Sequence, residues 1–371
     1  MAGESREALS SRAARYATVR YILAIIDIAY LAALLVIFLA LGASLKLSSA
    51  ISRINPNSAI VFLLYLAALL AIYSLLEFPL NFYRSFVVEH RFGLSRQKFQ
   101  DWFLDQLKSA GIAYIIAAVT FGAFYYLLRR YPATWWVMAA AFWLFFNLIL
   151  AKIFPLVILP LFFKYRRLTD ENLKQRILEL AKKLQLRIVD VFEIDFSRKT
   201  HKANAALAGW GSSRRVILAD TLKDKYTNDE IAVILAHELS HYKLRHLFKI
   251  AAINSATTLL AFYLIFRGST YLTALFGLGA LTDIASLPLI ILCLVLFGII
   301  AAPLENYFSR RMERNADRLA LKTVGDKEAF IATMDKLASQ NLADRKPHPV
   351  IKFFFFDHPP IDERIEMARN F

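Results

Sequence analysis

Long apolar runs dominate the first half of the chain and return twice in the second half. A membrane-spanning helix needs about 20 mostly apolar residues, and six runs reach that length. The apolar residues 154–163 are too few to cross again and are expected to be interfacial or re-entrant. The predicted spans lie at residues 21–43, 59–82, 110–128, 134–154, 247–266 and 284–303.

Two polar regions remain, at residues 164–245 and 305–371. The first opens with helical spacing of its apolar positions over residues 170–184, and a strand-like run follows over residues 187–194. We therefore expect a mainly α, polytopic helical membrane protein of about six spans that also carries a small β-hairpin or sheet.

The hairpin is predicted from two short strands, residues 204–210 and 214–219, which flank the turn residues 211–213. A helix then begins at Thr227, because Thr227 and Glu230 have the spacing of a capping box ahead of an apolar run. This helix carries the strongest chemical signal in the chain.

The pattern divides the chain into two domains. Residues 1–163 are expected to form an N-terminal membrane domain with four spans. Residues 164–371 are expected to form a second domain, interrupted by the spans at residues 247–266 and 284–303.

Composition supports a membrane protein with a solvated part. Hydrophobic residues make up 57% of the chain and charged residues 20%, and the formal net charge is +15. We expect no nucleic-acid partner, because no nucleic-acid-binding module is visible. Lysine and arginine are instead concentrated in alternate loops, which predicts that both termini and the large polar segment are cytoplasmic and that the basic loops face the lipid bilayer. The single cysteine, Cys293, excludes an intrachain disulfide.

The sequence His237-Glu238-Leu239-Ser240-His241 is an H-E-x-x-H motif. Residues four apart share one face of a helix, so His237 and His241 can bind one zinc ion. Glu238 is then the general base that takes a proton from a water molecule on the metal. One catalytic Zn²⁺ per chain is the expected cofactor.

A catalytic zinc ion needs a third protein ligand. Glu313 and Asp317 lie four residues apart on a predicted helix that leaves the last span. Taken alone, these two carboxylates are typical of a solvent-exposed helix on which they pair with nearby arginines. Together with the motif histidines they make Glu313 the best candidate for the third ligand, and Asp317 a candidate for orienting a ligating imidazole.

These motifs resemble the type I CAAX prenyl protease family of membrane zinc endopeptidases and, more distantly, the bacterial heat-shock membrane metalloprotease. The resemblance rests on the zinc motif, on the E-x-x-x-D spacing of Glu313 and Asp317, and on His358-Pro359-Pro360 with Arg364. It also rests on Asn204-Ala205 and on residues 89–95. Eukaryotic members have seven spans, whereas six are expected here.

The resemblance implies a gluzincin-like zinc metalloprotease domain and assigns further roles. His358 and Arg364 would be catalytic residues that help bind the substrate backbone and stabilise the oxyanion. Asn204 and Ala205 would bind the substrate main chain, since an extended peptide can add to a sheet edge. The substrate would be a peptide or protein, and the family's name implies a prenylated one.

Three alternatives remain open from sequence. The substrate can be the C-terminal tail of a prenylated protein, or a surplus membrane protein in a quality-control role of the heat-shock type. The chain can also be a catalytically inactive membrane scaffold, although Glu238 and Glu313 are both present. His246 lies five residues beyond His241 and off its helical face, so we expect it on the surface rather than at the metal.

Overall fold

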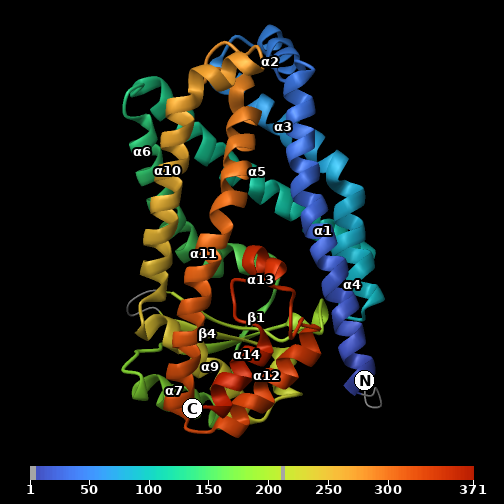
Figure 1. Ribbon diagram of the computed structural model, residues 1–371, viewed down its shortest axis with the longest axis vertical. Helices are drawn as coiled ribbons and strands as arrows, with labels where there is room; N and C mark the ends of the chain where they lie inside the picture. Colours follow the sequence, from blue (N-terminus) through green and yellow to red (C-terminus); the bar gives the residue numbers. More distant parts are fainter. Residues whose placement is uncertain (1–5, 210–213) are drawn as a thin grey trace.

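The computed structural model describes residues 6–209 and 214–371. Long helices fill one end of the molecule, and a small sheet with shorter helices fills the other, where both chain ends also lie (Figure 1). The helices of the N-terminal half are α1 (Arg6–Ala40), α2 (Ala43–Ile54), α3 (Ser58–Phe82), α4 (Val88–Arg91), α5 (Phe99–Arg130) and α6 (Trp135–Ile153).

The C-terminal half carries the remaining helices and the strands. The helices are α7 (Glu171–Lys183), α8 (Asp220–Lys223), α9 (Asn228–Lys243), α10 (His246–Leu275), α11 (Leu287–Val324), α12 (Lys327–Asn341), α13 (Pro349–Phe355) and α14 (Ile361–Arg369). The strands are β1 (Tyr165–Arg167), β2 (Asp190–Ile194), β3 (Ala205–Ala208) and β4 (Arg215–Ala219).

Six helices of the described chain are long and apolar enough to cross a membrane, which confirms the predicted number. Most extend beyond the predicted bounds at one end or both because helical geometry continues past the apolar core into polar flanks, whereas the first ends at Ala40, before the predicted residue 43. The fourth reaches Leu161 through a π-helical turn at Phe154–Ile158 and a 3-10 turn, so residues 154–161 continue the span. The six are Ser10–Ala40, Ser58–Arg91, Phe99–Arg130, Trp135–Leu161, His246–Leu275 and Ile284–Val324.

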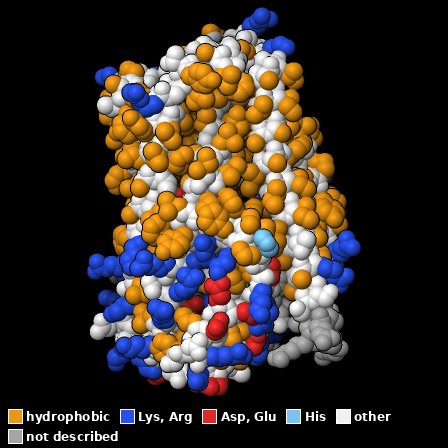
Figure 2. All heavy atoms as spheres, in the orientation of Figure 1, with side chains coloured by type: hydrophobic (Ala, Val, Ile, Leu, Met, Phe, Trp, Pro, Cys, Tyr) orange, Lys and Arg blue, Asp and Glu red, His pale blue; other side chains and the backbone are white. Residues whose placement is uncertain are grey.

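The surface divides sharply by chemistry. Figure 2 shows hydrophobic side chains over most of the long-helix end, and charged side chains gathered around the opposite end, which holds the sheet. Helix α11 belongs to both parts, because its 38 residues run without a break from apolar Leu287 to charged Arg318 and Lys322. One continuous helix therefore connects the apolar bundle to the polar end of the molecule.

The four strands form one sheet in the order β1-β2-β4-β3. β3 and β4 pair antiparallel, as the predicted hairpin requires, whereas the predicted turn at residues 211–213 lies outside the described residues. β2 begins at Asp190 rather than at residue 187, and β1 was not predicted because three residues give too little periodicity. β3 lies at the edge of the sheet, so one side of it has no neighbouring strand among the described residues.

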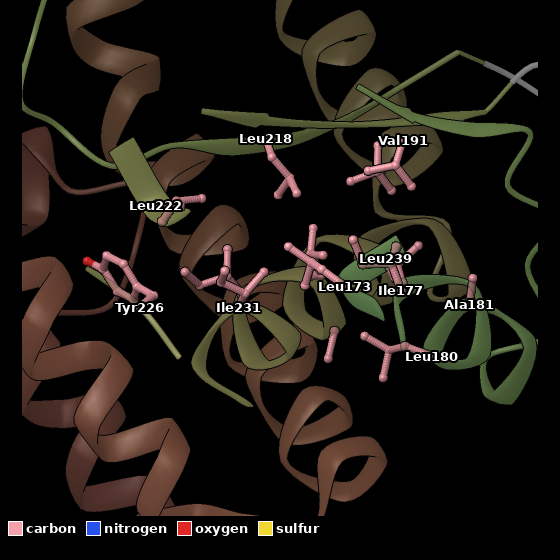
Figure 3. Close-up of a cluster of buried hydrophobic side chains, with 14 of the residues drawn as sticks. Leu173, Ile177, Leu180, Ala181, Val191, Leu218, Leu222, Tyr226, Ile231 and Leu239 are labelled. Carbon is pink, nitrogen blue, oxygen red and sulfur yellow. The ribbon is translucent and has the colours of Figure 1, made fainter. Parts of the chain in front are cut away.

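The largest core of the polar end lies between the sheet and helices α7, α9 and α11. Figure 3 shows Leu218 and Val191 of the sheet pointing towards the side chains of α7 and α9, such as Ile177 and Leu239. Leu239 is fully buried and lies between the two motif histidines in sequence. Packing of this face therefore fixes the rotation of α9 and, with it, the direction of its opposite face.

Acidic side chains within the first two spans share one cation. Asp27 on α1 and Glu77 on α3 both form ion pairs with Arg84, which lies in a π-helical turn directly after α3. A charge in a bilayer is costly unless it is paired, so Arg84 stabilises both carboxylates where they lie.

Prediction: Arg84→Gln lowers the thermal unfolding midpoint of the detergent-purified chain, because it leaves two carboxylates without their cation. The expected loss is about 2–3 kcal/mol. The triple variant Arg84→Gln, Asp27→Asn and Glu77→Gln should recover most of it, since no charge remains to be paired. Arg130→Gln, at the exposed C-terminal end of α5, is the control. A single variant as stable as wild type would contradict the pairing.

Candidate metal centre

Helix α9 places two imidazoles on one face. Its start is fixed by a complete capping box, in which the Thr227 hydroxyl accepts from the Glu230 N–H and the Glu230 carboxylate accepts from the Thr227 N–H. This confirms the start predicted from sequence. His237 is buried and His241 half-buried, and their Nε2 atoms lie 3.1 Å apart.

Helix α11 packs against α9 and brings a carboxylate to the two imidazoles. The Glu313 Oε2 atom lies 3.2 Å from His237 Nε2, and Oε1 lies 3.3 Å from His241 Nε2. The ligand atoms of all three residues fall within 4.8 Å of one another. The structure thus brings together the three residues that were predicted to bind the metal.

Asp317 lies behind His237 and is fully buried. Its Oδ1 atom is 2.8 Å from His237 Nδ1, so it accepts the N–H of the ring nitrogen that points away from Glu313. Arg364 on α14 donates two hydrogen bonds to the same carboxylate, from Nε at 2.8 Å and from Nη2 at 2.5 Å. A carboxylate held in this way keeps the His237 ring fixed with Nε2 free to bind a metal.

The two histidines differ in their affinity for a proton. Burial lowers the pKa of His237, but hydrogen bonds to Asp317 and Glu313 outweigh burial and raise it to about 10. Burial and the nearby His237 lower the pKa of His241 to about 4. The buried carboxylates therefore stabilise a positive charge at this point, and a bound cation can take the place of that proton.

The residues fit a zinc ion. Two imidazoles and one carboxylate form the donor set of several catalytic zinc sites. The two Nε2 atoms face each other, an arrangement that needs a proton or a cation between them. Glu313 Oε2 is buried, and its neighbours are the imidazole nitrogens of His237 and His358, at 3.2 Å and 3.4 Å, so this oxygen also faces the position that a cation would occupy.

Glu238 and His358 lie at the same centre. Burial raises the pKa of Glu238, which makes its carboxylate a stronger base. His358 Nε2 lies 3.4 Å from Glu313 Oε2, and its Nδ1 lies 2.8 Å from Asp357. Burial lowers the pKa of His358, but the bond to Asp357 raises it above the ordinary value. His358 is thus suited to donate a proton or hydrogen bond beside the metal ligands.

Arg364 lies in a different place from His358. Pro360 caps α14 and fixes where that helix begins, so that Arg364, four residues on, reaches Asp317. Its Nη2 atom is 3.5 Å from His237 Nδ1, on the side of the ring away from Glu313. The hydrogen bonds described here give Arg364 a positioning role, and its expected contact with the oxyanion stays a prediction.

The open edge of β3 lies beside α9. The Ala219 N–H donates to the Asn204 carbonyl. Along an antiparallel strand, the N–H and C=O groups of successive residues point alternately towards the partner strand and away from it. The backbone groups of Ala205 and Leu207 therefore point away from β4. The Tyr242 hydroxyl, next to His241, donates to the Gly209 carbonyl on this edge. The exposed Asn204 and the half-buried Ala205 begin the edge. An extended peptide added to it would run past the histidines.

The upstream loop at residues 89–95 contacts the segment that leads into β3. Ser95 pairs with Thr200, and the His201 N–H donates to the Leu94 carbonyl at 2.9 Å. Gly93 has a φ of 65°, and a Cβ atom there would meet the Arg12 guanidinium at 3.0 Å. The left-handed backbone is what favours glycine here, because a side chain at a positive φ is strained.

The surface position expected for His246 is wrong. The residue is buried, and its Nδ1 atom lies 3.1 Å from His241 Nδ1. The expectation assumed that α9 continues straight, but it ends at Lys243. Arg245 adopts the left-handed conformation, with φ 55° and ψ 37°, and turns the chain so that α10 begins at His246. No glycine marks this turn, so the sequence carries no signal for it.

Comparisons with known proteins agree with this geometry. Residues 167–371 match peptidase family M48, and residues 1–164 match the CAAX prenyl protease N-terminal region, which is described as five membrane helices. Four of the six candidate spans of the described chain fall within the second match.

Individual relatives cover most of the chain. An uncharacterized metalloprotease of Bacillus subtilis, YhfN, is 31% identical over 81% of this chain and 71% of its own length. CAAX prenyl protease 1 of Saccharomyces cerevisiae is 30% identical over 80% of this chain and 69% of its own. The crystal structure of S. mikatae Ste24p has the same fold, with a TM-score of 0.88 at 24% identity, covering 99% of this chain and 90% of that one.

Proposed function

This chain belongs to peptidase family M48 as a membrane zinc metalloprotease of the CAAX prenyl protease type, and from that premise we propose that it cleaves peptides that carry a prenyl chain. The peptide lies along the open edge of β3, and the hydrocarbon chain lies among the spans. We also propose that residues 1–163 form an N-terminal membrane domain and that residues 164–371 form the metallopeptidase domain, whose two spans complete the wall around the substrate.

The observation that supports a prenylated substrate is an apolar cavity among the spans. It has a volume of about 270 Å³ and is walled by α5, α6, α10 and α11, with aromatic side chains such as Phe124, Trp143 and Phe297. Glu305 lines it and precedes Glu313 by eight residues on α11, which is about 12 Å along the helix axis. A substrate with both a peptide and a hydrocarbon part can therefore reach both places at once.

The chemistry is hydrolysis of a peptide bond. A zinc ion held by His237, His241 and Glu313 would supply a Lewis acid and a bound water. Glu238 accepts a proton from the water and delivers it to the nitrogen of the departing amine. His358 donates a hydrogen bond to the oxygen that becomes negatively charged. Asp317 keeps His237 in the required tautomer and is itself held by Arg364.

Prediction: Glu238→Gln abolishes turnover but not zinc binding, because the amide cannot accept the proton of the water. The expected loss in kcat is at least about 100-fold. Zinc content and cleavage of a fluorogenic farnesylated peptide are measured on the same purified sample. Glu366→Gln, on the exposed end of α14, is the matched control. Full activity of Glu238→Gln would show that another group is the base.

Prediction: a farnesylated peptide is cleaved with a lower KM than its unprenylated form, because only the prenylated form fills the apolar cavity. Phe297→Glu should remove the difference, since a charge in that cavity repels a hydrocarbon chain. Cleavage of the unprenylated peptide reports whether the variant still folds. Equal KM values in wild type would favour a quality-control protease of the heat-shock type instead.

Prediction: Ala205→Pro lowers kcat/KM by about 10-fold, because it removes one N–H from the open edge of β3 and about one hydrogen bond to the substrate. The bonds between β3 and β4 remain, since this N–H does not face β4. Ala205→Val keeps the N–H and is the control. Zinc content is unchanged in both. An unaffected Ala205→Pro variant would exclude strand addition at this residue.

We propose further that the termini and the catalytic end face the cytoplasm, as the loop charges indicate. In a Cys293→Ala background, a single cysteine at exposed Ser339 should resist a membrane-impermeant maleimide in intact bacterial cells and react after permeabilisation. A cysteine at exposed Ser49, between the first two spans, should react in intact cells. The reverse pattern would invert the topology.

A further inference from the structure

His246 lies directly behind one of the metal ligands. Only 1% of its surface is exposed, and its ring meets that of His241 edge-on, at 77° and 5.0 Å between ring centres. The Nδ1 atoms of the two rings are 3.1 Å apart. The single left-handed residue Arg245 makes this contact, because it reverses the chain between α9 and α10.

The contact requires particular tautomers. His241 Nε2 faces Glu313 and His237, so it must be unprotonated to bind zinc. The proton of neutral His241 then lies on Nδ1 and is donated to His246 Nδ1. His246 must in turn carry its own proton on Nε2. That Nε2 atom is buried and has no hydrogen-bond partner in residues 6–209 and 214–371, so Nδ1 makes the one hydrogen bond described for this ring.

The two zinc-binding imidazoles thus donate their Nδ1 protons to different kinds of acceptor. His237 donates to Asp317, a carboxylate that Arg364 holds in place. His241 donates to a neutral imidazole that is held by the turn at Arg245. A metal-bound histidine ordinarily has such an acceptor, and its removal typically weakens metal binding about 10- to 100-fold.

We propose that His246 is a positioning residue for the zinc site: it accepts the Nδ1 proton of His241 and so fixes the tautomer and the ring orientation of that ligand. The inference concerns zinc binding and does not depend on the substrate class. A failure of the proposed prenylated substrate would change peptide selectivity and leave zinc affinity unaltered.

The experiment measures zinc affinity of the full chain in detergent by competition with a chromophoric chelator. His246→Phe keeps a ring but has no acceptor, and we expect it to lower zinc affinity about 10- to 100-fold. His246→Asn, whose amide oxygen can accept the same proton, should remain within a few-fold of wild type. Thr273→Val, a buried change elsewhere on α10, is the control.

A second readout separates positioning from packing. Cobalt is substituted for zinc, and its visible absorption reports the geometry of the ligands. We expect the spectrum to change in His246→Phe and to remain as in wild type in His246→Asn and Thr273→Val. The thermal midpoint of each metal-free variant shows whether it folds. A folded His246→Phe variant with wild-type zinc affinity and an unchanged cobalt spectrum would overturn the proposal.

Discussion

The buried pair of Asp317 and Arg364 is the interaction on which the metal centre depends. A carboxylate that is fully buried is unstable unless its charge is compensated, and Arg364 supplies two hydrogen bonds to it while His237 supplies a third contact. These residues come from α11, α14 and α9. None of the three helices can shift without leaving a buried charge unpaired, so the ligands are held in position before any substrate arrives.

Helix α11 then determines where this centre lies relative to the apolar helix bundle. It carries the apolar wall of the cavity, the cavity residue Glu305, the ligand Glu313 and the buried Asp317 on one continuous helix. Because an α-helix has a fixed rise per residue, the spacing along α11 between the apolar cavity and the metal ligand Glu313 is built into the chain. A substrate with its lipid and its scissile bond at a matching separation gains from both contacts at once.

Local spacing explains what could be predicted from sequence. His237 and His241 share a helical face whatever the tertiary structure, and the capping box at Thr227 marks where that helix begins. The six spans are equally local. The pairing of Arg364 with Asp317 is not, because it crosses 47 residues and depends on how α14 docks. His246 was misplaced because one left-handed residue reversed the chain, and nothing in the sequence marked it.

The position of His246 also explains why two spans, α10 and α11, hold the metal site in place. Glu313 lies on α11, and α9, which carries His237 and His241, leads directly into α10, so each helix that carries zinc ligands is, or is joined to, a candidate span. The His237 side is rigid through an ion pair, whereas the His241 side is rigid through chain reversal and burial. The geometry around the metal is therefore set by the packing of α9 against α11, and the contact between α10 and α11 within the bundle supports it.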